Sequence, residues 1–153
     1  MSLTSKLNPM EAALWEAERH NETLVQALKL WQSSPAANLN ELESDSEKLR
    51  LVDQILFRFT KLQDAVGNRL IPATLSALQE PFEDWPMIDR LNRLEKLGFI
   101  STDEWLAWRE IRNRLAHEYP DLPEIRFAAI LNAIDAAHTL LVCYAHWRSK
   151  LAH

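Results

Sequence analysis

The stretch Asn8–Ser33, NPMEAALWEAERHNETLVQALKLWQS, decides the fold class. Asn8 is suited to cap a helix, and Pro9 is suited to its first position, where a missing N–H costs nothing. The residues that follow recur at alternating spacings of three and four, the period of one helix face. This stripe comprises Leu7, Met10, Leu14, Ala17, Asn21, Leu24, Leu28 and Trp31. We therefore predict a long amphipathic helix, whose stripe either joins the core or forms a helix–helix seam with Asn21 setting the register.

The composition extends this prediction to the whole chain. Leu and Ala together number 43, Val, Ile and Thr together number 18, and Gly occurs twice among 153 residues. β-Branched residues favour strands and turn-rich folds need glycine, so the balance favours helices. Apolar residues make up 47% of the chain, enough for a core. The length fits one domain spanning residues 1–153, and we expect an all-α fold.

The remaining helices are predicted from caps and breakers. After a loop over 36–43, the second helix begins near Ser44 and bends near Ile71, because Pro72 removes a helical hydrogen bond. The third begins near Pro86 with Asp84 as its cap and ends at Gly98.

A fourth helix starts at the capping box Ser101-x-x-Glu104 and is ended by Pro120. Asp121 and Pro123 open the last helix, which runs for about 25 residues or more. We therefore expect a five-helix up-and-down bundle in which short connections join antiparallel neighbours.

Several classes of protein and site are not expected. No apolar run approaches the roughly 18 residues of a membrane span, and the N-terminus is too charged for a signal peptide. One cysteine, Cys143, leaves no internal disulfide, so a cytoplasmic protein is expected. His138 and His146 lie too far apart for one metal, and we expect no metal and no cofactor. The net charge of −5 argues against broad nucleic-acid binding but permits a small basic site.

The segment 112–120, RNRLAHEYP, carries the most chemistry. Its cationic residues also suit a helix C-terminus for purely electrostatic reasons, and Tyr119 can simply pack. On one straight helix, five steps separate Arg112 from His117 by roughly 140°. A two-fold dimer would instead bring the Arg and His of both chains into one cleft. Arg binds phosphate and His exchanges protons near neutral pH, which suits metal-free cleavage of RNA through its 2′-hydroxyl.

The flanking residues extend this interpretation. Asn113 is placed to bind sugar or phosphate, and Arg109 and Arg114 are placed to guide RNA. As ordinary solvated charges on a helix, the two arginines need no such role.

The pattern Arg112-x4-His117-x-Tyr119, with an Asn directly after the Arg, resembles the signature of HEPN-domain proteins of the HepT-like toxin family. The stretch Phe59–Gly67 is similar to the second helix of these small all-helical proteins. The resemblance implies a HEPN-type homodimer and a metal-independent ribonuclease site at the dimer interface. It implies that Arg112 binds phosphate and that His117 is the general acid or base.

The resemblance also implies a partner and a modification. HepT-like toxins are silenced by an MntA-type nucleotidyltransferase antitoxin, which transfers AMP to the motif tyrosine, here Tyr119. AMP beside an Arg/His cleft would add charge and bulk where RNA must bind.

Two other functions fit the same residues. A non-catalytic companion of a minimal nucleotidyltransferase would bind substrate or nucleotide without turnover. A plain helical dimerisation protein would need no site at all.

Overall fold

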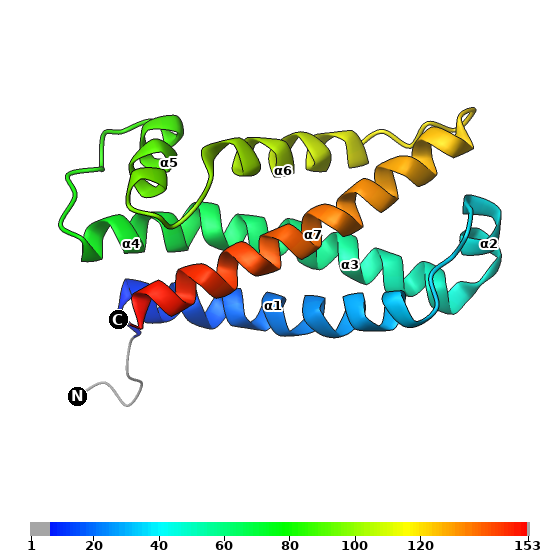
Figure 1. The fold of residues 1–153 in the computed structure, drawn as a ribbon, viewed down its shortest axis with the longest axis horizontal. Coiled ribbons are helices and arrows are strands. Elements are labelled where there is room, and N and C mark those ends of the chain that lie inside the picture. The colour runs from blue at the N-terminus through cyan, green and yellow to red at the C-terminus, as the bar shows by residue number, and fades with distance from the viewer. Residues whose placement is uncertain (1–6, 153) are drawn as a thin grey trace.

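The computed structural model describes residues 7–152, and every regular element in that range is a helix (Figure 1). The elements are α1 (Pro9–Ser33), α2 (Leu39–Ser44), α3 (Ser46–Ala65), the π-helical turn η1 (Val66–Leu70), α4 (Ile71–Ala77), α5 (Met87–Lys96), α6 (Thr102–Leu115) and α7 (Pro123–Leu151). Because α3, η1 and α4 follow one another without interruption, they form one continuous rod. The predicted all-α class is confirmed.

The first helix forms where the sequence predicts it. The Asn8 side chain accepts a hydrogen bond from the Glu11 N–H at 2.8 Å, and the Glu11 carboxylate accepts one from the Asn8 N–H. This reciprocal capping box satisfies N–H groups that have no partner within the helix. The stripe joins the core through Ala17, Leu24, Leu28 and Trp31, which are buried.

The predicted number of five helices is wrong, because the segment 36–43 is not only a loop. The described part of the chain has six helical rods, and the additional one is the short α2. Asn38 caps this helix by accepting from the Glu41 N–H at 2.8 Å. Leu39 and Leu42 are buried against the core. Two apolar positions were too few to show a helical period in the sequence.

The irregularity predicted near Ile71 lies one turn earlier and is a change of winding. In η1 the Ile71 N–H donates to the Val66 carbonyl, five residues back, as in a π-helix. Gly67 lies in this turn, and a Cβ there would approach the Trp105 ring to 3.0 Å. The missing side chain thus leaves room for the Trp105 ring of α6 against this turn.

At α5, the predicted N-terminal cap is wrong and the predicted glycine at the C-terminal end is confirmed. Pro86, and not Asp84, precedes the first residue of α5, and no side chain caps it. At the other end, Gly98 has a φ of 82° and its N–H donates to the Glu95 carbonyl. The Phe99 N–H donates to the Leu94 carbonyl, completing a glycine-terminated helix end as predicted.

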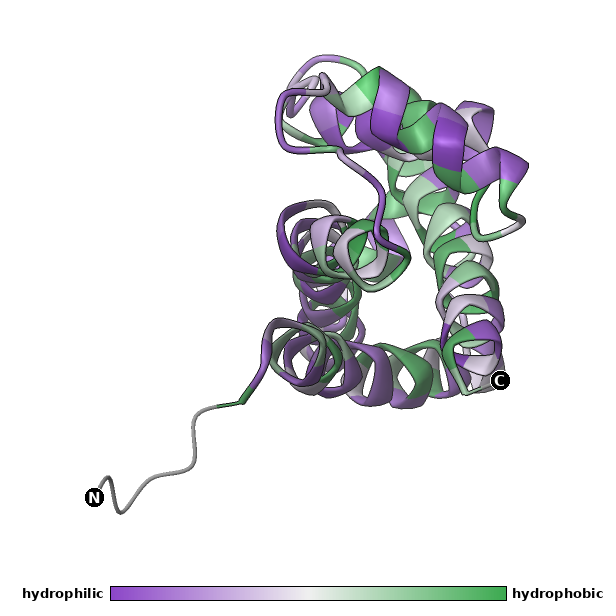
Figure 2. Ribbon diagram, turned by 90° about the vertical axis from the view of Figure 1, so that its left-hand side faces the viewer, coloured by the Kyte–Doolittle hydropathy of each residue, from purple (hydrophilic) through white to green (hydrophobic). Residues whose placement is uncertain are grey.

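The long rods α1, α3–α4, α6 and α7 alternate in direction, and α7 crosses the others diagonally (Figure 1). Hydrophilic and hydrophobic residues alternate along each helix, as expected for amphipathic helices around a shared core (Figure 2). Hydrogen bonds fasten α7 to its neighbours: Trp147 Nε1 donates to Thr74 Oγ1 at 3.0 Å, and Tyr144 Oη donates to Glu18 at 2.9 Å. Burial and this contact with Glu18 raise the pKa of Tyr144 well above its usual range.

By length and composition alone, α7 is apolar enough to cross a membrane. About 33% of its most apolar window is buried inside the protein. Core helices of many proteins pass the same test, so this helix is weak evidence for a membrane span.

Candidate functional site

The residues predicted to form the site lie at and just beyond the end of α6. Ser101 caps the start of this helix, accepting from the Glu104 N–H at 3.2 Å, so the predicted start is confirmed. The helix ends at Leu115, well before Pro120, which corrects the predicted end. Ala116 and His117 donate to carbonyls three residues back, a tightened last turn. His117 therefore lies outside the helix, and the straight-helix angle between it and Arg112 does not apply.

Arg112 is held by a carboxylate from another helix. Its Nη1 lies 2.5 Å from Oδ1 of Asp64 on α3, and its Nη2 lies 3.5 Å from Oδ2. The two side chains are 29% and 31% exposed. The pair thus joins α3 to α6, with part of the guanidinium open to solvent. Arg112 keeps donors that can contact a phosphate.

Asp64 lies close to the point where Trp105 of α6 contacts the rod. Asp64 is the penultimate residue of α3, and η1 begins two residues later. Trp105 packs over Gly67 in that turn and is 4% exposed. This contact fixes α6 beside α3, and Arg112 extends from α6 two turns further along. The Asp64 carboxylate and the Arg112 guanidinium are therefore brought together by the contacts between α6 and the rod that contains α3.

Sequence reasoning assigned no role to Asp64, although it lies in the stretch Phe59–Gly67 on which the family resemblance rested. The presence of a carboxylate in that stretch was the one feature of the sequence that could have indicated a role for Asp64. Nothing in the sequence indicated that it would pair with a residue 48 positions away.

His117 is exposed and lines a cleft of about 370 Å³ beside α2, α3 and α7. The apolar lining comprises Leu39, Leu42, Leu49, Leu56, Leu115, Ala129 and Ile130. Polar groups at this cleft include Glu118, Asp53 and the ion pair of Arg126 Nη2 with Glu43 Oε1 at 2.6 Å. Among residues 7–152, no hydrogen bond or ion pair joins His117 to Arg112. Within one chain, Arg112 thus contacts Asp64, whereas His117 lies at this separate cleft.

Tyr119 adopts a strained backbone conformation close to His117. Its φ is 47°, in the left-handed region that non-glycine residues seldom occupy. Its ring centroid is 6.0 Å from that of His117, and the two rings are tilted by 56°. The Tyr119 carbonyl accepts from the Leu122 N–H at 3.0 Å, which closes the turn before α7. The turn keeps the imidazole and the half-buried phenol together.

The flanking residues are exposed but differ in their contacts. Arg114 Nη2 pairs with Glu110 Oε1 at 2.6 Å, one helical turn earlier. The Arg109 guanidinium carbon lies 6.0 Å from the Trp105 ring centroid. Asn113 is exposed, and its carbonyl accepts from the Ala116 N–H. Arg109 and Asn113 therefore present polar groups near Arg112, whereas the charge of Arg114 is balanced by its neighbour.

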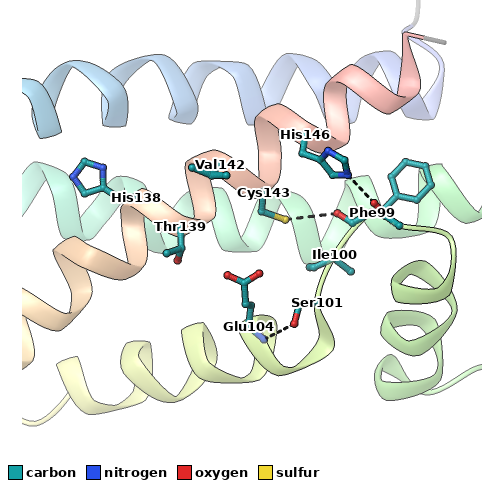
Figure 3. Close-up of a pocket in the computed structure, with 10 residues that line it drawn as sticks. Phe99, Ile100, Ser101, Glu104, His138, Thr139, Val142, Cys143 and His146 are labelled. Carbon is teal, nitrogen blue, oxygen red and sulfur yellow. Dashed lines mark hydrogen bonds between the residues drawn. The ribbon is translucent and has the colours of Figure 1, made fainter.

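A second cleft lies between α6, α7 and the α5–α6 turn (Figure 3). The Cys143 thiol contacts the Phe99 carbonyl at 3.8 Å, and burial raises the pKa of Cys143 to about 12. The thiol is therefore protonated at neutral pH and is a poor nucleophile. His146 Nε2 donates to the Gly98 carbonyl at 2.8 Å. Both groups thus serve to attach α7 to the turn.

Within residues 7–152, no group of three or more His, Cys, Asp or Glu residues is arranged to hold a metal ion. His138 Nε2 lies 3.0 Å from Gln32 Nε2, so its ring contacts α1.

Comparison with protein-family models, with curated proteins and with solved structures found no match to this chain.

Proposed function

We propose that this protein is a HEPN-type, HepT-like toxin that cleaves RNA without a metal ion. The observation that carries the proposal is the arrangement at the end of α6. A guanidinium positioned by Asp64 is followed, outside the helix, by an exposed imidazole and a neighbouring tyrosine. These residue types supply phosphate binding, proton transfer and a modifiable hydroxyl.

In the proposed mechanism, Arg112 binds the scissile phosphate and stabilises the charge that develops on it. His117 takes the proton from the ribose 2′-hydroxyl, or returns a proton to the leaving 5′-oxygen. Asp64 acts as a positioning residue for Arg112 and does not touch the substrate. Asn113 and Arg109 contact the flanking backbone of the RNA, whereas Arg114, whose charge Glu110 balances, is assigned no contact.

A homodimer completes the site in this proposal. Because Arg112 and His117 of one chain have different neighbours, a two-fold axis near the end of α6 would pair the Arg of one chain with the His of the other. The exposed position of His117 beyond the helix leaves the imidazole accessible to a partner chain.

Regulation by a nucleotidyltransferase antitoxin of the MntA type belongs to the same proposal. Transfer of AMP to the Tyr119 hydroxyl would add a phosphate and a nucleoside next to His117, since the two rings lie 6.0 Å apart. The added charge and bulk would repel the RNA backbone. The proposal includes a cytoplasmic setting, where RNA is accessible, and no membrane attachment.

The test is an RNA-cleavage assay in excess chelator with the wild type, His117→Ala and the matched control His146→Ala. His146 is an exposed histidine on α7, away from the end of α6. We expect cleavage by the wild type and by His146→Ala but none by His117→Ala. Equal cleavage by both variants would refute the proposed role of His117.

The second candidate function is a non-catalytic nucleotide-binding companion of a nucleotidyltransferase. The mixed lining of the cleft beside His117 favours it, because apolar walls with a few polar groups suit a small-molecule ligand. A folded, unmodified protein that binds nucleotide, cleaves none of several RNA classes and does not inhibit growth on expression would support this function.

A further inference from the structure

An exposed aromatic ring lies on the same face of α3 as Asp64. Phe57, Lys61 and Asp64 are spaced by four and three residues, so they follow one another along a single strip of the helix. The Phe57 side chain is 52% exposed, so its ring is open to solvent. The strip extends over about 10 Å from Phe57 to Asp64.

Two cations flank the Phe57 ring. The Arg58 guanidinium carbon lies 5.5 Å from the ring centroid, and Lys61 Nζ lies 5.6 Å from it. Within residues 7–152, neither cation pairs with a carboxylate; Arg58 Nη1 instead donates to His20 Nδ1 at 2.9 Å. Two cations that have no carboxylate partner among the described residues therefore lie beside the ring.

The strip ends at the proposed phosphate-binding group, because Asp64 contacts Arg112. The other cation-flanked aromatic residue of high exposure is Trp15 on α1, which is 58% exposed with the Arg19 guanidinium 4.7 Å from its ring. Trp15 has no contact with the residues at the end of α6 among those that the structure describes. Among the described residues, only Phe57 combines exposure, flanking cations and a helical strip leading to Arg112.

We propose that Phe57 is a stacking platform for one base of single-stranded RNA, with Lys61 contacting the backbone between that base and the phosphate held by Arg112. This inference rests on the proposed function and specifies the form of RNA that the site accepts. Proteins bind single strands by combining aromatic rings, on which bases stack, with cations that follow the phosphates. A paired base is not free to stack on a side chain, so the site selects unpaired RNA.

A second copy of this chain is the competing occupant of the strip. The centre of a subunit interface is depleted in charged residues, and lysine in particular is rare there. The strip instead alternates Phe57 with Lys61 and Asp64, and its net charge with Arg58 and Arg112 is positive. This charge is complementary to a phosphate backbone.

The inference is tested by measuring the binding of a fluorescein-labelled single-stranded RNA whose riboses are 2′-O-methylated. Methylation blocks attack by the 2′-oxygen, so the wild type binds the probe without cleaving it. Phe57→Ala is expected to weaken binding about 5- to 160-fold, the range found for loss of one stacked base. Phe57→Trp is expected to bind as well as the wild type. Trp15→Ala is the matched control and is expected to change Kd by less than about twofold.

The salt dependence of binding provides a second measurement. Lys61→Gln is expected to lower the slope of log K against log salt by about 1, and Phe57→Ala to leave that slope unchanged. Equal Kd values for Phe57→Ala and Trp15→Ala would overturn the inference, as would an absence of probe binding by the wild type. Conversion of a dimer to a monomer by Phe57→Ala would identify a subunit contact and also overturn it.

Cleavage of unmethylated RNA by the wild type separates this inference from the proposed function. If the wild type cleaves RNA and Phe57→Ala binds normally, the nuclease stands and the stacking site is refuted. If Phe57→Ala selectively loses binding but the wild type never cleaves, the stacking site stands and the nuclease is refuted.

Discussion

The pair formed by Arg112 and Asp64 allows a sharp test, because its effects on stability and on activity should separate. Asp64→Asn preserves the size of the side chain and one acceptor oxygen but removes the charge. The N–O distance is 2.5 Å, and each side chain is about 30% exposed. Water therefore screens the pair, and its loss should lower the free energy of unfolding by no more than about 1 kcal/mol.

The effect on RNA cleavage should be larger and should appear in kcat. Without the carboxylate, the guanidinium loses the contact that fixes its position, and misplacement by about 1 Å costs up to about 100-fold in rate. We expect kcat to fall about 10- to 100-fold. We expect KM to stay unchanged or to decrease, because an unpaired Arg112 attracts phosphate more strongly.

The assay is steady-state cleavage of a fluorogenic RNA in chelator, combined with urea denaturation of the same samples. Glu110→Gln is the matched control, since it frees Arg114 on the same helix from an exposed pair. It should leave kcat and KM within about twofold of the wild type. The reasoning is refuted if Asp64→Asn and Glu110→Gln have the same kcat. It is also refuted if Asp64→Asn loses several kcal/mol of stability and its activity falls only with the folded fraction.

Three further outcomes are expected. Gly67→Ala should lower the free energy of unfolding, measured by urea denaturation, by about 1 kcal/mol. The added methyl group costs about 1–3 kcal/mol by overpacking against the buried Trp105 ring, which exceeds the gain of about 1 kcal/mol from the higher helix propensity of alanine. A more stable variant would show that the Trp105 ring moves to accommodate the methyl group. Cys143 should react with iodoacetamide at pH 8 far more slowly in the native protein than in urea, because burial raises its pKa to about 12, and equal rates would contradict this. Burial, followed by the charge of Arg58, lowers the pKa of His20, so the unfolded chain binds more protons than the native one and stability should fall as the pH drops below about 6.5. His20→Gln should reduce this dependence of the free energy of unfolding on pH. An unchanged dependence would show that other groups cause it.

Most of the helices were predictable because their ends are encoded locally. Asn8 with Glu11, Ser101 with Glu104, and Gly98 after α5 form caps within a few residues, and the structure has all three. The short α2 was missed since a six-residue helix with two buried leucines shows no measurable period. The π-helical turn was not predicted, because Pro72 indicates an irregularity near Ile71 but does not specify the change of winding over Val66–Leu70.

The candidate site was predictable as a set of residues but not as a geometry. The residues Arg112, His117 and Tyr119 are close in sequence, so their types and spacing single them out as candidates. The pairing of Arg112 with Asp64 depends on the packing of α6 beside α3. The direction of His117 was wrongly derived from an unbroken helix, because the early end of α6 at Leu115 is not marked by any glycine or adjacent proline.

The central claim is that Arg112 and His117 from two chains share one metal-free ribonuclease site. The most direct test mixes Arg112→Ala with His117→Ala in excess chelator and measures RNA cleavage, with heterodimer formation followed by native mass spectrometry. Neither variant alone should cleave RNA, and activity should appear on mixing, because the heterodimer regains one Arg and one His in the same cleft. A mixture that forms heterodimers but stays inactive, beside a wild type that cleaves, would contradict the shared site.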